Sequence, residues 1–200
     1  MLIFHELAAS VKIESDNQHT LLDYDKSLTL IGQGRSAYVF RIKQTGKAMK
    51  VFFPEYMYIA EEEAEIYKVV QEITYYPTLY DAGSNYLVID YIEGTTLFDC
   101  LTNGIPISQE VVRDIDIALQ LAKQEGLNPS DVHLRNILIT SDLQVKIIDV
   151  ARFRQTKDCN QWLDLKKAFY CYYEKRYFPK KIPEFMLNGI AMLYKKNLLK

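Results

Sequence analysis

The segment DVHLRNILITSDLQVKIID, residues 131–149, decides how the rest of the sequence is interpreted. It places Asp131 five residues before Asn136, directly ahead of an apolar run, and it ends on Asp149. A serine and an aspartate, typical turn residues, separate the first apolar run from the second. We therefore expect a compact β-hairpin that brings Asp131, Asn136 and Asp149 to one point.

These three side chains suit phosphoryl transfer. Such chemistry needs a carboxylate that orients the attacking hydroxyl and accepts its proton, and oxygen ligands that hold Mg²⁺ on the phosphates. Asp131 is the candidate base, and Asn136 and Asp149 are the candidate metal ligands. Taken separately, each piece also fits an ordinary hairpin with turn-forming residues at its ends, so the other motifs decide between the two interpretations.

Upstream, a glycine-rich stretch at residues 32–34 lies between two strand-like runs, residues 28–31 and 37–43. Glycines let a backbone approach phosphates closely, but they also serve ordinary turns. A dinucleotide-binding fold needs such glycines to open a helix, whereas here they open a second strand. The pattern Gly-x-x-x-x-Gly-Lys-Ser/Thr of P-loop proteins is absent from the sequence. Lys50 lies in the next predicted strand, residues 47–53, where a kinase needs a lysine to reach the phosphates.

The remaining elements follow from periodicity. Apolar residues at helical spacing predict a helix over about residues 58–73, and two further strands follow it. After Gly94 the pattern becomes mostly helical. We expect strands at 78–80 and 86–90, and helices at 95–101, 108–124 with Ser108 as its cap, 161–177 and 183–198. Strands first and helices later predict an α+β fold.

The composition excludes several classes of protein. The chain has 200 residues, of which 48% are hydrophobic and 25% charged, with a formal net charge of −2. This balance gives no basic footprint, so no nucleic-acid partner is predicted. No apolar run is long enough to span a bilayer, and the first residues lack a signal-peptide pattern. Cys100, Cys159 and Cys171 form no framework, which suits reduced thiols. We predict a cytoplasmic protein with no membrane contact.

With the glycine stretch, Lys50 and residues 131–149 in this order, the chain resembles the protein-kinase superfamily over about residues 28–178. It looks closest to compact, atypical members such as the RIO kinases and the KEOPS-complex kinase. The resemblance implies a bilobal α+β fold. Residues 1–92 would form a nucleotide-covering lobe, an antiparallel β-sheet with one helix, and residues 93–200 a reduced, mostly helical catalytic lobe. It also implies ATP and Mg²⁺ as cofactors.

The resemblance gives each candidate residue a role. Asp131 would be the catalytic base, Asn136 and Asp149 would hold the metal, and Lys50 would contact the α- and β-phosphates. The other nucleotide-binding positions lie on the glycine loop, the strand after it, and the last strand with its hinge: Gly32, Gly34, Val39, the gatekeeper Ile89, Asp90 and Ile92.

The acidic partner of Lys50 is less sharply defined by the sequence. Glu63, in the predicted helix, resembles the family's glutamate and fits the helical spacing best. Glu62 and Glu65 are alternatives, because all of them belong to one acidic run.

Three departures from the family pattern limit what the resemblance implies. The usual His-Arg-Asp reads Pro-Ser-Asp up to Asp131, and the usual Asp-Phe-Gly reads Asp-Val-Ala from Asp149. No Ala-Pro-Glu is present, and only about fifteen residues separate Asp149 from Asp164, which looks like the start of the helix under the active site. A long activation loop cannot be built from so short a link.

The leading hypothesis is an ATP-dependent atypical serine/threonine protein kinase or autokinase. His133, two residues after Asp131, resembles aminoglycoside- and choline-kinase-like enzymes and favours a small-molecule phosphotransferase instead. The missing bracing elements favour a nucleotide-binding pseudokinase. Arg135 can supply positive charge to a phosphate. The sequence identifies no phosphoacceptor, whether a protein or a small molecule.

Overall fold

A five-stranded antiparallel sheet forms most of the first half of the chain. The computed structural model describes residues 4–14 and 19–196. The sheet has the strand order β3-β4-β5-β7-β6. Its strands are β3 (Leu28–Gln33), β4 (Ala37–Ile42), β5 (Lys47–Phe52), β6 (Leu79–Ala82) and β7 (Tyr86–Asp90). Each lies within three residues of its predicted bounds, because alternating apolar side chains and intervening turns mark them clearly.

Both faces of this sheet are covered, and the alternation of side chains explains how. Leu87 packs into the core cluster that contains helix α2 (Met57–Val70), whereas Val88 packs into the cluster that contains α1 (Phe4–Ser10). Successive residues of a strand point to opposite faces, so a doubly covered strand must be apolar throughout. The residues of β7 up to Val88 are accordingly all buried.

Helix α2 ends at Val70, three residues before the predicted end, because Ile73 instead forms a turn hydrogen bond to the Val70 carbonyl. Its buried face is apolar at the expected helical spacing except for one charged residue, Glu63, which is 1% exposed. A carboxylate is rarely buried without a partner. The buried position of Glu63 therefore requires a partner for its carboxylate.

The predicted hairpin is confirmed as β9 (Ile137–Thr140) and β10 (Val145–Ile147). A third strand, β8 (Gly94–Thr96), pairs with β9 in an antiparallel sheet. The prediction of a helix from residue 95 is therefore wrong at its start, because pairing with a distant strand overrides the local pattern. Thr96 instead caps helix α3 by accepting a hydrogen bond from the Asp99 amide.

Helices supply most of the second half of the chain. They are α3 (Leu97–Asn103), α4 (Gln109–Gln124), α5 (Gln161–Ala168) followed by a π-helical turn η2 (Phe169–Tyr173), and α6 (Glu184–Lys195). The Ser108 cap of α4 is confirmed. The helix predicted over 161–177 is wrong beyond residue 168, where the backbone widens into η2. The end predicted at residue 198 lies outside the described residues.

Three N-terminal elements have no counterpart in the sequence prediction: α1, β1 (Lys12–Ile13) and β2 (Leu21–Asp23). They are too short for the spacing of their apolar residues to show a helical or strand period. A short 3-10 helix, η1 (Pro54–Tyr56), leads into α2.

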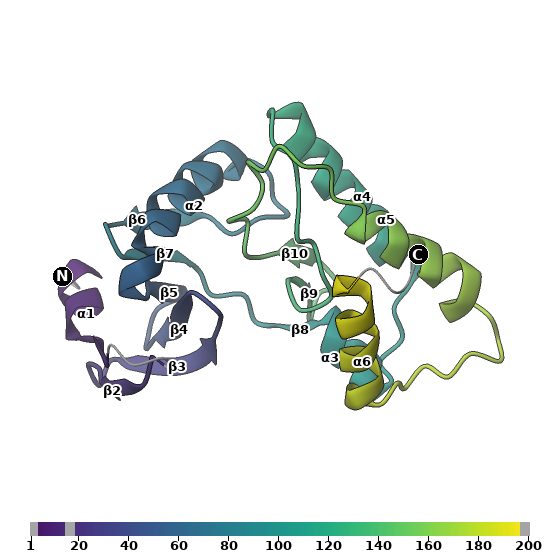
Figure 1. Ribbon diagram of the computed structural model, residues 1–200, viewed down its shortest axis with the longest axis horizontal. Coiled ribbons are helices and arrows are strands. Elements are labelled where there is room, and N and C mark those ends of the chain that lie inside the picture. The colour runs from purple at the N-terminus through teal and green to yellow at the C-terminus, as the bar shows by residue number, and fades with distance from the viewer. Residues whose placement is uncertain (1–3, 15–18, 197–200) are drawn as a thin grey trace.

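Figure 1 shows the five-stranded sheet with α2 on one side of the molecule and α3 to α6 on the other. The larger core cluster contains residues of α2 and of α4, so it crosses the predicted boundary at residues 92 and 93. Tyr76 adds a direct link, since its buried hydroxyl donates to the Ala118 carbonyl of α4. The structure is thus an α+β fold with six α-helices and only antiparallel sheets among the residues described. None of the helices in that part of the chain combines the length and apolarity needed to cross a bilayer.

Candidate active site

Lys50 of β5 lies at the centre of a three-residue charge cluster. Its ammonium nitrogen Nζ is 2.7 Å from Glu63 Oε2 and 3.3 Å from Asp149 Oδ1. The sheet register positions it, because Lys50 pairs with Val39 of β4 and Leu87 of β7 in the middle of the sheet. The structure therefore selects Glu63 as the partner of Lys50. Glu65, one of the alternatives, instead pairs with Lys68.

Burial governs the ionisation of this cluster. Loss of solvent raises the pKa of Glu63 to about 7, while the Lys50 ammonium acts in the opposite direction. Burial alone would lower the pKa of Lys50, but the charges of Glu63 and Asp149 outweigh this and raise it. The second oxygen of Glu63, Oε1, is buried and has no hydrogen-bond partner among the described residues. Lys50 is thus held as a cation between two carboxylates.

Asp149 follows β10 in the left-handed backbone conformation, at φ 61°. Its backbone amide donates to the hydroxyl of Tyr67, at 3.3 Å, and Tyr67 of α2 is fully buried. Enclosure would raise the pKa of Asp149, but Lys50 outweighs it and holds that pKa below the usual value. Half of the Asp149 side chain, 48%, remains exposed, so it is open to a ligand.

Tyr67 is a site residue that the sequence interpretation missed. It lies four residues after Glu63, one helical turn along α2, so both face the same point. A tyrosine on the buried face of a helix gives no further signal from sequence alone.

Asp131 and Asn136 lie on the loop that leads into β9. Asp131 has φ 60°, and its carbonyl accepts a hydrogen bond from the Asn136 side-chain nitrogen at 3.4 Å. The backbone amide of Asn136 donates to the His133 carbonyl, and the backbone carbonyl of Asn136 accepts from the Ile148 amide. These bonds tie the loop to the chain just before Asp149. The structure thus brings the candidate base and both candidate metal ligands onto one connected backbone unit.

Asp131 and the residues just before it contact the segment that follows Asp149. Arg152 Nε lies 3.3 Å from Asp131 Oδ2, so the segment after Asp149 supplies a cation to Asp131. Ser130 is 2% exposed, and its hydroxyl donates to the backbone carbonyl of Asn128. The backbone amide of Asn128 in turn donates to the Phe153 carbonyl at 2.6 Å. Nothing in the sequence marks Arg152 as the residue that would contact Asp131.

His133 lies between the charged groups of this loop. Burial lowers its pKa, while the carboxylates of Asp131 and Asp149 act in the opposite direction. The positive charges of Lys195 and Arg135 lower it further. The imidazole is therefore favoured in its neutral form.

The glycine stretch spans the end of β3 and the turn into β4. Neither Gly32 nor Gly34 has a positive φ, and a Cβ added at either meets nothing closer than 3.6 Å. Gly94 is the opposite case, because its Cβ would lie 2.8 Å from the carbonyl oxygen of Ile139. The fold therefore requires glycine at 94 but not at 32 or 34. The glycines of the loop leave space that the protein itself does not use.

The last predicted nucleotide contacts lie at the end of β7. Ile89 pairs with Ala48 of β5, and the Asp90 amide donates to the Thr78 carbonyl. Among the described residues, no acceptor is found for the amide of Ile92. Val39 lies opposite Lys50. Val39 and Ile89, two of the expected nucleotide-binding positions, thus lie on the strands that flank β5. No direct interaction within the described chain joins the glycine stretch to Lys50.

The donor set suits a magnesium ion bound to phosphates. The side-chain nitrogen of Asn136 donates a hydrogen bond to the Asp131 carbonyl. The side-chain oxygen of Asn136 has no donor among the described residues. Asp149 adds a half-exposed carboxylate. The described residues contain no cluster of three or more His, Cys, Asp or Glu side chains that could hold a metal alone. Mg²⁺ is commonly held by one or two protein oxygens together with substrate phosphates, so this pair fits.

Comparison with known proteins relates the chain to kinases, although no family model matches it. It is 50% identical over 174 residues to "Putative serine/threonine-protein kinase YrzF" of Bacillus subtilis, covering 86% of this chain and 81% of that protein. It is 26% identical over 146 residues to the 3-phosphoinositide-dependent protein kinase 1 of Arabidopsis thaliana, covering 64% of this chain and 30% of that protein. Over 77 residues it is 32% identical to the serine/threonine-protein kinase PknB of Mycolicibacterium smegmatis, covering 36% of this chain and 12% of that protein. The chain therefore belongs to the serine/threonine protein-kinase-like family.

Proposed function

We propose that the protein is a reduced, atypical serine/threonine protein kinase that uses ATP and Mg²⁺ and phosphorylates another protein or itself. The observation that carries this proposal is Lys50, which bridges the buried Glu63 and the exposed Asp149. A solvated lysine at a sheet edge has no such arrangement. In the proposed bilobal organisation, residues 1–92 cover the nucleotide and residues 93–200 carry the catalytic loop.

At the nucleotide end, Lys50 donates to the α- and β-phosphates. Glu63 fixes the lysine side chain, so no ordering is required when the nucleotide binds. Gly32 and Gly34 let the loop backbone approach the phosphates. The adenine lies beside Val39 and Ile89, with the backbone of Asp90 and Ile92 as its hydrogen-bonding partners.

Asn136 and Asp149 would hold Mg²⁺, which when bound neutralises negative charge on the phosphates. Lys50 keeps Asp149 ionised and Tyr67 holds the Asp149 backbone. The carboxylate is therefore ready to bind a cation without changing its protonation state.

At the acceptor end, Asp131 orients the attacking hydroxyl and takes its proton. A bond forms between the hydroxyl oxygen and the γ-phosphorus, and the bond from that phosphorus to the β–γ bridging oxygen breaks, which releases ADP. Asp131 is 38% exposed, so an acceptor can reach it.

The short link after Asp149 supports the reduced form of the fold. Helix α5 already begins at Gln161, so the chain between them is too short for a long activation loop. Regulation by phosphorylation of such a loop is therefore not part of the proposal.

The test is phosphate transfer from labelled ATP with Mg²⁺, to the protein itself, to generic protein acceptors and to small alcohols. We expect label on protein, and a fall of at least about a hundredfold in Asp149→Ala, since a metal ion contributes several kcal/mol to the barrier. Asp158→Ala is the matched control, because Asp158 is exposed and has no ion-pair partner in the described chain.

The other outcomes would replace the proposal. Label on small alcohols alone would indicate a small-molecule phosphotransferase. Binding of Mg-ATP without transfer to any acceptor would indicate a pseudokinase.

A further inference from the structure

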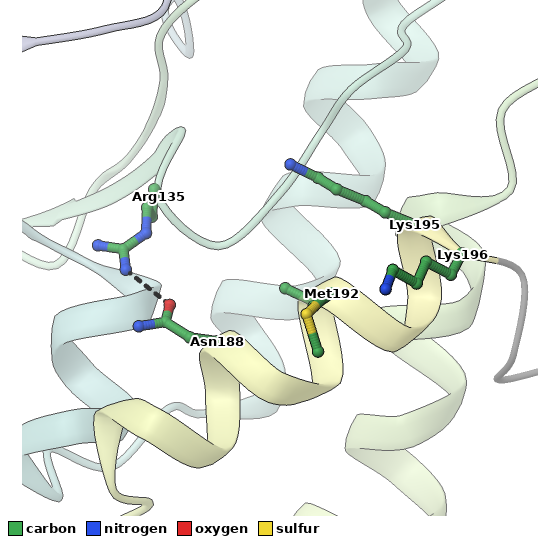
Figure 2. A pocket seen from close by; sticks show the side chains of 6 residues that line it. Arg135, Asn188, Met192, Lys195 and Lys196 are labelled. Atoms are coloured by element: carbon green, nitrogen blue, oxygen red, sulfur yellow. Dashed lines mark hydrogen bonds between the residues drawn. The ribbon is translucent and has the colours of Figure 1, made fainter.

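A groove of about 490 Å³ lies between helix α6 and the loop before Asn136, outside the proposed nucleotide site. Figure 2 shows Asn188, Met192 and Lys195 on α6 and Lys196 just after its end, with Arg135 reaching from the loop to Asn188. The groove is lined by Arg135, Asn188, Ala191, Met192, Lys195 and Lys196.

Arg135 ties α6 to the catalytic loop. Its guanidinium donates to Asn188 Oδ1 at 3.1 Å and lies 3.6 Å from Glu184 Oε1, both on α6. It also lies over the ring of Phe98, 3.4 Å from the centroid. Because Arg135 immediately precedes Asn136, the groove begins next to the proposed metal site.

The groove is positively charged although the whole chain is not. The formal net charge is −2, yet three of the six lining residues are cations. In the described part of the chain neither Lys195 nor Lys196 has a carboxylate partner. The charge of Lys195 also reaches His133, whose pKa it lowers. Within the described residues, both lysine charges are therefore left without a carboxylate.

The groove also has an apolar part. Ala191 and Met192 line it, and Met192 is 53% exposed. A methionine at a binding surface adapts to apolar side chains of different shape. A nucleic-acid backbone would need a wider basic surface than three residues provide. Mixed cationic and apolar lining instead matches a peptide that carries both acidic and apolar side chains.

We propose that this groove binds an acidic segment of the protein phosphoacceptor, with an apolar side chain against Met192 and carboxylates beside Lys195 and Lys196. The inference rests on the proposed kinase function, since it names the substrate class of the same site. It gives the chain an acceptor-docking surface on α6, where the short link after Asp149 leaves no room for a long activation loop.

The test uses two fluorescent peptides, each with one serine and one leucine, flanked by four glutamates in the first and four glutamines in the second. Binding is measured by fluorescence anisotropy, and transfer by label from ATP with Mg²⁺. We expect the protein to bind and phosphorylate the glutamate peptide in preference to the glutamine peptide. Added salt should weaken this binding, because exposed charge pairs are screened.

Two variants locate the interaction on α6. Lys195→Glu/Lys196→Glu should weaken binding of the glutamate peptide and raise its KM by about tenfold, with kcat unchanged. Lys195→Gln/Lys196→Gln should have a smaller effect in the same direction and avoids adding acidic residues to the end of a helix. Lys167→Glu/Lys175→Glu is the matched control, since both lysines are exposed and outside the groove.

A peptide with lysines in place of the glutamates completes the charge exchange. It should bind the Lys195→Glu/Lys196→Glu variant better than the unchanged protein. A merely structural defect would not produce such a gain in binding. Equal binding of the glutamate and glutamine peptides would overturn the inference, as would an equal loss in the control variant. Displacement of the glutamate peptide by a single-stranded RNA oligomer that binds more tightly would assign the groove to a nucleic acid instead.

These measurements separate the two proposals. If ATP is never hydrolysed or transferred, the proposed function fails, but anisotropy still reports whether the groove binds the acidic peptide. If transfer occurs without preference for that peptide, the kinase proposal stands and the docking inference fails.

Discussion

Asp131 and Asp149, the two aspartates of the candidate site, are held in opposite ways. Asp149 is fixed from the interior, by Lys50 on its side chain and by the buried Tyr67 on its backbone. Asp131 is fixed from the surface, by the half-exposed Arg152. A pair with a buried partner is screened little by water, whereas a pair exposed on both sides contributes little. The proposed nucleotide end of the site is therefore held more firmly than the proposed acceptor end.

The largest expected effect comes from breaking the proposed nucleotide end. Lys50→Met leaves Glu63 buried without its cation, and at a pH well above 7, where the carboxyl of the unfolded chain is ionised, removal of one partner of a buried ion pair costs about 3–5 kcal/mol. Urea unfolding measures this loss. The double variant Lys50→Met/Glu63→Gln should recover part of it, because no buried charge then remains. A double variant less stable than Lys50→Met would contradict the pairing.

A smaller effect is expected at the backbone of Asp149. Tyr67→Phe removes only the hydroxyl that accepts from the Asp149 amide, so stability should fall by about 1 kcal/mol. The dependence of phosphate transfer on Mg²⁺ concentration should move to higher Mg²⁺, since Asp149 loses a positioning contact. Tyr86→Phe, which removes a tyrosine hydroxyl bonded to Asp81 away from the site, is the control. An unchanged Mg²⁺ dependence in Tyr67→Phe would show that Tyr67 has no role in positioning.

The smallest effect is expected at the proposed acceptor end. Arg152→Gln breaks an exposed pair, so the free energy of unfolding should change by about 0.5 kcal/mol or less. Because the hydrogen bond from the Asn128 backbone amide to the Phe153 carbonyl remains, transfer should fall far less than in Asp149→Ala. Loss of stability comparable to that of Lys50→Met would mean that the two ends do not differ as described.

The sequence predicted the elements whose signals are local. Alternation of apolar and polar residues identified the strands around Lys50. Ser108, as a helix-capping residue, identified the start of α4. The hairpin after Asn136 followed from two apolar runs and a turn. These features depend on neighbours within a few residues, so they can be recognised without the fold.

The remaining features depend on contacts between distant parts of the chain. An acidic run offers several glutamates, and only the packing of α2 on the sheet selects Glu63. Thr95 joins a strand because β9 lies beside it. The contacts of Tyr67 with Asp149 and of Arg152 with Asp131 join separate elements, and no local pattern predicts them.

The contrast between the glycines has a consequence for how this protein can change over time. Replacement of Gly94 brings a side chain against the Ile139 carbonyl, whatever the protein binds. Gly32 and Gly34 face no such limit, so the fold alone would accept a side chain there. A descendant that no longer bound a nucleotide would be free to lose these two glycines while it kept the third. Their presence or absence in a relative with this fold would therefore report whether the loop still has a ligand to cover.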